Sequence, residues 1–209
     1  MSFKLGIGKS DFATLRKEGC YYVDKTEFLH DIVEVNNEVS LFTRPRRFGK
    51  TLMMSMMENF FNIRKNSAEI FEGLAISKHK DFCEKWMNRY PVLFISLKDA
   101  EADEFDIAYD KLKNVLADIC KKLSYLLSQD GINSFDTEVF NRLQAQRGTE
   151  ADVQNSLKTI MRMMNSVYGK KVILLIDEYD VPLARASENN NGAFFVAGCQ
   201  IEDLSNGVT

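Results

Sequence analysis

Thr43-Arg-Pro-Arg-Arg-Phe-Gly-Lys-Thr-Leu52 is the stretch of sequence that decides the fold. It joins a short apolar strand candidate, 39–43, to a strong helix candidate, 50–63. A Gly-Lys-Thr in this setting suits phosphate binding, because backbone N–H groups and the helix dipole face the anion at the start of a helix. The lysine can then reach the β- and γ-phosphates of a nucleotide, and the threonine can bind its magnesium ion. The stretch therefore predicts a phosphate-binding loop with Lys50 and Thr51 in these two roles.

The loop departs from the usual GxxxxGK[ST] pattern at its first position, where Arg44 replaces glycine. Gly49 keeps the position at which a side chain would block close approach of the backbone to phosphate. A basic surface turn in front of a core helix is the alternative interpretation of this segment. A second tripeptide, Gly8-Lys-Ser10, has no strand before it, and we interpret it as the start of a helix capped by Ser10.

A pair of carboxylates follows the most apolar strand candidate in the chain. The run 172–176 is Val-Ile-Leu-Leu-Ile, whose continuous hydrophobicity indicates burial on both faces, and Asp177 and Glu178 come directly after it. Ligands of open parallel sheets bind at the carboxyl ends of the strands. An aspartate there can hold the magnesium shell, and the next glutamate can activate the attacking water. We therefore expect Thr51 and Asp177 at a magnesium ion, and Lys50 and Glu178 as the catalytic residues of nucleotide hydrolysis.

The nucleotide is expected to be ATP. An Asn-Lys-x-Asp motif, which would read guanine, does not occur in the sequence, so adenine is the default. Tyr21 or Tyr22 could stack on the base, although a packing role is the favoured interpretation of both tyrosines.

Helices alternate with strands along the rest of the chain. Residues 91–97 are a further strand candidate with proline at the first position, where no ladder donor is lost. The helices that we expect lie at 10–19, 24–34, 104–128, 136–146 and 150–167. Strands separated by helices indicate a parallel sheet with helical crossovers. The expected fold is therefore α/β, a three-layer P-loop NTPase fold with a mostly parallel sheet, in which a helical segment, 1–36, packs on an ATPase core, 37–209.

The composition and charge bear on which partners the protein can bind and on the cellular compartment in which it is expected. A net charge of −3 gives no global attraction to nucleic acid or to anionic lipid. Four separated cysteines and two histidines form no zinc-binding pattern. No apolar run reaches the ~18 residues needed to cross a bilayer, and no apolar signal region follows the first residues. We expect a cytoplasmic protein without a membrane or nucleic-acid partner of its own.

Several segments carry a resemblance to a known family. They are, in chain order, Ile7-Gly-Lys-Ser-Asp-Phe12, Tyr21-Tyr-Val-Asp-Lys-Thr26, the stretch 43–52, Phe71-Glu-Gly-Leu-Ala-Ile76, the strand candidate 91–97 and Ile176-Asp-Glu-Tyr-Asp180. Together they resemble the bacterial predicted AAA-ATPase (AAA-ATPase-like) family over about 1–188. The resemblance implies ATP and Mg²⁺ as ligands, and it makes Arg44 a family variant of the loop. The expected nucleotide contacts are Arg44, Arg46, Arg47, Phe48, Gly49, Lys50, Thr51 and Leu52.

Longer members of that family are similar to this chain up to the Asp-Glu strand and then usually continue to a nuclease-like domain. We expect only the ATPase region here, truncated after the Asp-Glu strand, which is the Walker B region. A remaining strand at 193–197 is expected to insert between 39–43 and 172–176. That insertion would bring Asp177 close to Thr51 and leave an exposed apolar edge, so homo-oligomerisation is expected. Three functions stay open: an ATPase coupled to an unknown process, a nucleotide switch without hydrolysis, and an inactive remnant.

Overall fold

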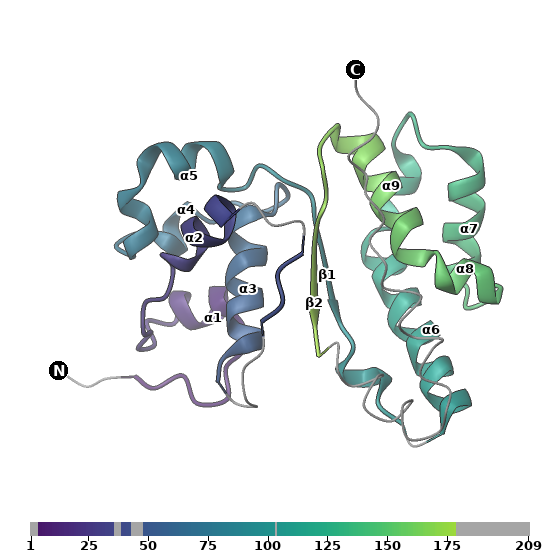
Figure 1. The fold of residues 1–209 in the computed structure, drawn as a ribbon, viewed down its shortest axis with the longest axis horizontal. Coiled ribbons are helices and arrows are strands. Elements are labelled where there is room, and N and C mark those ends of the chain that lie inside the picture. The colour runs from purple at the N-terminus through teal and green to yellow at the C-terminus, as the bar shows by residue number, and fades with distance from the viewer. Residues whose placement is uncertain (1–3, 36–38, 43–47, 103, 179–209) are drawn as a thin grey trace. The chain divides into compact units, whose positions relative to one another are not determined.

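The computed structural model describes residues 4–35, 39–42, 48–102 and 104–178 (Figure 1). These residues divide into two compact units. The first comprises the described parts of Met1–Phe94 and Tyr168–Asp177, and the second those of Ile95–Val167 and Glu178–Thr209.

The structure contains the predicted helices, with shifted ends, and also forms short helical elements at 68–71, 75–78 and 80–86 that the sequence did not predict. In chain order the elements are α1 (Phe12–Lys17), α2 (Phe28–Val35), α3 (Lys50–Phe61), α4 (Ala68–Phe71), the 3₁₀ turn η1 (Ala75–Lys78), α5 (Lys80–Trp86), β1 (Val92–Ser96), η2 (Lys98–Ala100), α6 (Phe105–Lys122), η3 (Ser124–Ser128), α7 (Ser134–Gln144), α8 (Glu150–Gln154), α9 (Ser156–Tyr168) and β2 (Ile173–Asp177).

The sheet of the described residues consists of β1 and β2, which are hydrogen-bonded neighbours and run parallel. The chain passes from one to the other through α6, α7, α8 and α9, which is the helical crossover that parallel strands require. The strand predictions at 91–97 and 172–176 are therefore confirmed. The mixed arrangement of helices with a small parallel sheet is compatible with an α/β fold.

The strand predicted at 39–43 is not formed in its described part, residues 39–42. Val39 and Leu41 are exposed there, while Phe42 packs edge-on against Phe28 of α2 with ring centroids 5.2 Å apart. A strand exists only through backbone hydrogen bonds to a neighbour. The neighbour predicted for this segment, 193–197, lies outside the described residues. The expected exposed edge and the self-association derived from it stay predictions.

Two helix starts differ from the predicted ones. Asp11, rather than Ser10, caps α1, because its carboxylate accepts the N–H of Thr14 at 2.7 Å. The helix predicted to start at residue 24 starts at Phe28, and the carboxylate of Asp24 instead accepts the N–H of Thr26 at 2.9 Å and that of Ala75 at 2.7 Å. Asp24 therefore joins two distant segments of the first unit.

Aromatic side chains from distant parts of the sequence form the core of the first unit. The ring of Phe71 lies 4.9 Å from that of Phe12 and 5.2 Å from that of Phe60, centroid to centroid, and each of these rings is fully buried. Leu175 of β2 belongs to the same buried cluster. Burial of such rings is the main stabilising contribution in a unit of this size.

Helices make up most of the described part of the second unit, in which α6 packs against α7. Arg142 binds Asp152 through two hydrogen bonds of 2.9 Å, and Arg162 binds the buried Asp136. The helix predicted at 150–167 is interrupted at Asn155, whose side chain donates to the carbonyl of Ala151 at 2.9 Å. The helix predicted at 104–128 ends at Lys122 and continues as η3. Within the described residues, no helix combines the length and the apolarity that a membrane span requires.

Candidate functional site

Gly49 begins α3 in the left-handed conformation, with φ 77° and ψ 23°. A residue with a β-carbon adopts this conformation at a cost, so glycine is required by the backbone itself. A β-carbon built at Gly49 meets no described atom within 4 Å. Glycine is therefore needed at this position for the backbone conformation of the turn into α3. From the sequence alone, the same glycine was explained by the close approach of the backbone to phosphate.

The first turn of α3 offers backbone donors to an anion. Met53 makes the first intrahelical bond, its N–H donating to the carbonyl of Gly49 at 3.0 Å. The N–H groups of the residues between them have no acceptor within a helix, and the positive end of the dipole lies there. Lys50 and Thr51 are half-buried on this turn, and Phe48 in front of it is 63% exposed. A helix start of this kind is a general anion-binding arrangement.

The arginines predicted for the same loop, Arg44, Arg46 and Arg47, lie outside the described residues. Leu52 follows on the first turn of α3 and is half-buried. The predicted nucleotide contacts from Phe48 to Leu52 are thus consecutive residues at one helix start.

Asp177 is the last residue of β2 and is 3% exposed, while Glu178 follows it and is half-buried. Glu178 has φ 57°, the left-handed conformation that residues other than glycine rarely adopt. The chain therefore turns sharply directly after the buried carboxylate. The pair stands where the sequence predicted it, at the carboxyl end of a strand. In β2, Leu175 and Asp177 are buried and the other residues are half-buried, so the described residues do not show the predicted burial on both faces.

Hydrogen bonds fix the direction of α3 relative to the strands. The N–H of Tyr90, just before β1, donates to the carbonyl of Phe61 at 3.0 Å, so the end of α3 lies beside the start of β1. The N–H of Ile173 donates to the carbonyl of Pro91 at 2.9 Å, which places the start of β2 there as well. Because α3 also packs against β2, its first turn is directed toward the end of β2 that carries Asp177 (Figure 1).

The second Gly-Lys-Ser tripeptide is engaged elsewhere. Lys9 forms an ion pair with Glu18, and hydrogen bonds from Lys9 and Lys4 hold the pKa of Glu18 at about 2. Ser10 is exposed directly before α1. The interpretation of this tripeptide as a helix start is confirmed, with the cap at Asp11.

The two tyrosines have different surroundings. Tyr22 packs edge-on against Phe12 with ring centroids 5.3 Å apart, and its hydroxyl contacts the sulfur of Met56 at 3.3 Å. Its packing role is therefore confirmed, whereas Tyr21 is exposed.

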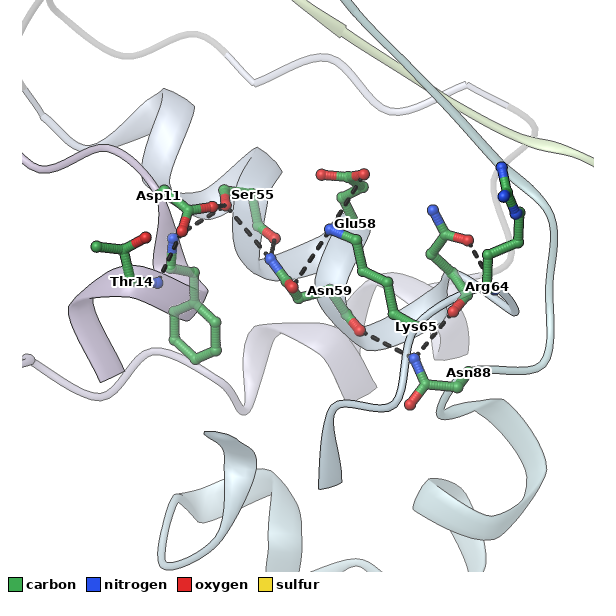
Figure 2. A network of polar contacts seen from close by, with 10 residues as sticks. Asp11, Thr14, Ser55, Glu58, Asn59, Arg64, Lys65 and Asn88 are labelled. Atoms are coloured by element: carbon green, nitrogen blue, oxygen red, sulfur yellow. Dashed lines mark hydrogen bonds and ion pairs between the residues drawn. The ribbon is translucent and has the colours of Figure 1, made fainter. Parts of the chain in front are cut away.

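Sequence reasoning missed a polar network along α3. Asp11, Ser55, Asn59 and Asn88 form this chain of hydrogen bonds (Figure 2). Its partners are up to 44 residues apart in sequence. The one signal that could have indicated it is the pair of polar residues, Ser55 and Asn59, at helical spacing within an otherwise apolar stretch.

Comparison with known proteins agrees with the resemblance found in the sequence. The family model described as "Predicted AAA-ATPase" (AAA-ATPase_like) matches residues 6–195. The chain is also similar to a protein of Azotobacter chroococcum mcd 1, described as an uncharacterized protein in the vnfD 5' region, with 28% identity over 181 residues. The match covers 86% of this chain and 30% of that relative. No solved structure matches the chain. By the extent of the family match, the chain belongs to the predicted AAA-ATPase family.

Proposed function

We propose that this chain binds Mg-ATP where α3 begins and β2 ends, and that it hydrolyses the bound nucleotide. One observation carries the proposal. Tyr90 is hydrogen-bonded to Phe61 and Ile173 to Pro91, and α3 packs against β2, so the Gly49 end of α3 and the Asp177 end of β2 are directed toward the same end of the first unit. Family membership supports the choice of nucleotide. A three-layer P-loop fold is part of the proposal.

The first turn of α3 would hold the phosphates. Its N–H groups point away from the helix and toward the anion, and the macrodipole favours negative charge there. The ammonium group of Lys50 would neutralise charge on the β- and γ-phosphates. Arg44, Arg46 and Arg47 would add positive charge from the loop in front, because guanidinium groups pair with phosphate oxygens through two hydrogen bonds.

Thr51 and Asp177 suit a magnesium ion that is shared with phosphates. Mg²⁺ in such sites takes one or two protein oxygens and completes its shell with phosphate oxygens and water. The ion would supply charge neutralisation at the β- and γ-phosphates. Asp177 suits this task because it brings carboxylate oxygens, which hard cations such as Mg²⁺ prefer, to the carboxyl end of β2.

Glu178 would act as the general base. It would take a proton from a water molecule, whose oxygen forms a bond to the γ-phosphorus while the bond to the β–γ bridging oxygen breaks. ADP and inorganic phosphate are the products. The left-handed backbone at Glu178 supports this role, since residues in rarely populated conformations concentrate at functional sites.

Two measurements on one preparation test the proposal. Titration with ATP and with GTP, each in the presence of Mg²⁺, is expected to show binding of ATP in preference to GTP. A steady-state phosphate-release assay is then expected to show turnover. Absence of nucleotide binding would overturn the proposal. Binding without turnover would overturn its hydrolytic part and favour a nucleotide switch.

A further inference from the structure

A polar stripe runs along one face of α3, the helix that begins at the proposed phosphate site. Ser55 and Asn59 are 6% and 4% exposed, and Thr51 precedes Ser55 by one helical turn on the same face. The core-facing stripe of a helix is ordinarily apolar, and a buried hydroxyl or amide is costly unless it is hydrogen-bonded. The polar residues of this stripe therefore need partners from other segments.

Asp11 and Phe12 of the N-terminal segment supply the partners of Ser55. The hydroxyl of Ser55 accepts the N–H of Phe12 at 3.0 Å and donates to one carboxylate oxygen of Asp11 at 3.0 Å. The other carboxylate oxygen of Asp11 accepts the N–H of Thr14 (Figure 2). One carboxylate thus caps α1 and holds α3 at the same time.

The next turn of α3 is fixed in the same way. The amide of Asn59 donates to the carbonyl of Ser55 at 2.7 Å and accepts from the ammonium of Lys65 at 3.3 Å. Lys65 is also paired with Glu58 at 3.1 Å. The side chain of Asn88 donates to the carbonyl of Asn59 at 3.1 Å. Among the described residues, every buried side-chain nitrogen and oxygen has a hydrogen-bond partner.

We infer that Asp11 and Ser55 are positioning residues for the magnesium and phosphate site on the first turn of α3; this inference rests on the proposed function. The hydrophobic effect is non-directional, whereas a hydrogen bond fixes both distance and angle. Ser55 lies one turn from Thr51, so the bond to Asp11 sets how α3 is rotated where Thr51 must meet the ion. A displacement of about 1 Å at such a site is enough to weaken function strongly.

The inference also gives the N-terminal segment Ile7–Phe12 a role that its sequence did not reveal. Its Gly-Lys-Ser tripeptide has no role in phosphate binding in the proposed function. Asp11 and Phe12, which follow the tripeptide, instead hold α3, the helix whose first turn would bind the phosphates. The segment is therefore expected to influence nucleotide binding through α3.

The test compares ATP affinity with Mg²⁺ and with EDTA in the full chain, measured by calorimetry at a temperature where every variant is folded. The increment in affinity due to Mg²⁺ reports the placement of Thr51, whereas a loss of folded protein lowers both affinities equally. Ser55→Ala and Asp11→Asn are each expected to reduce the Mg²⁺ increment by about three- to twentyfold. Ser55→Thr keeps the hydroxyl and is expected to retain the increment.

Asp24→Asn is the matched control, since it alters a carboxylate of the same unit that bonds Thr26 and Ala75 rather than α3. Its Mg²⁺ increment should equal that of the wild type. Asp11→Asn keeps the test possible if Ser55→Ala fails to fold, because asparagine is as good an N-cap as aspartate. The double variant should lose no more than the larger single loss, because each change removes the same bond between Ser55 and Asp11.

Lys50→Ala in the same series separates the two claims. Loss of ATP binding in Lys50→Ala together with an unchanged Mg²⁺ increment in Asp11→Asn would overturn the positioning role and leave the proposed function standing. An equal reduction of the increment in Asp24→Asn would also overturn it. ATP binding by Lys50→Ala at wild-type affinity would overturn the proposed function, and the positioning role with it.

Discussion

The N–H of Ile63 donates to the carbonyl of Tyr90 at 2.8 Å, so the chain leaving α3 is fastened to the chain entering β1. The same two stretches form an isolated parallel bridge between Asn62 and Tyr90. Asn88 reinforces the junction, because its side chain donates to the carbonyls of Asn59 and Asn62 at 3.1 and 2.9 Å. The end of α3 opposite the proposed site is therefore held by hydrogen bonds to the segment before β1.

Asn88→Ala is expected to lower the free energy of unfolding by about 3 kcal/mol, because three hydrogen bonds are lost and φ is 56° at this position. Asn88→Gly loses the same bonds but accepts the left-handed backbone. It should be more stable than Asn88→Ala by about 1 kcal/mol. Urea denaturation of the two variants measures the difference, and equal stabilities would show that the backbone conformation carries no cost.

Gly49→Ala tests the turn into α3. Alanine in the left-handed conformation costs about 1–2 kcal/mol, so stability should fall by that amount. Gly131 has φ 84° and no described atom within 4 Å of a built β-carbon, so Gly131→Ala is the matched control. Both variants should lose similar stability in urea, and only Gly49→Ala should also bind ATP more weakly. Equal ATP binding by the two variants would argue against a phosphate site at Gly49.

Glu178→Gln is expected to keep ATP binding and to lower phosphate release by about two to four orders of magnitude, the usual contribution of a positioned base. The amide preserves the shape of the side chain and removes its basicity. A steady-state phosphate-release assay beside an ATP titration checks both parts. Undiminished turnover in this variant would remove Glu178 from the reaction.

The pair Arg142 and Asp152 predicts a pH dependence of stability. Hydrogen bonds from Arg142, and further ones from Thr149, lower the pKa of Asp152 to about 2. An unfolded aspartate titrates near ~3.9, so the stabilisation is complete above that pH and is lost as the pH falls toward 2. Asp152→Asn has no ionisable carboxyl group at this position, so its stability lacks this pH dependence.

Thermal unfolding of wild type and Asp152→Asn between pH 6 and pH 2 measures the effect. The stability difference between them should be constant above about pH 5 and shrink below about pH 4. A difference that stays constant over the whole range would contradict the contribution of the charged carboxylate.

Local signals in the sequence predicted the elements around the site well. The apolar run 172–176 predicted that β2 is a strand, but not its burial, because only the face with Leu175 and Asp177 is buried among the described residues. Gly49 predicted the start of α3, since a glycine between a basic loop and an apolar helix punctuates the chain. The spacing of apolar residues at helical intervals predicted the helices between β1 and β2.

Contacts between distant residues could not be predicted in this way. The bond between Ser55 and Asp11 spans 44 residues, and neither residue type indicates its partner. Asp24 precedes a helix by spacing, yet it bonds Ala75, 51 residues away. The interruption at Asn155 arises because asparagine side chains compete with the helix for backbone groups. Helix propensities are too weak to predict the residue at which this happens.

Calorimetric titration of Mg-ATP against Lys50→Ala and Lys9→Ala tests the central claim most directly. Both lysines follow a glycine, but Lys50 stands on the first turn of α3 and Lys9 is paired with Glu18. Circular dichroism first establishes that each variant keeps the wild-type helix content. The account predicts that Lys50→Ala weakens Mg-ATP binding at least about tenfold, as loss of a charge-assisted contact should, and that Lys9→Ala binds like the wild type. Wild-type affinity in Lys50→Ala, or an equal loss in both variants, would contradict it.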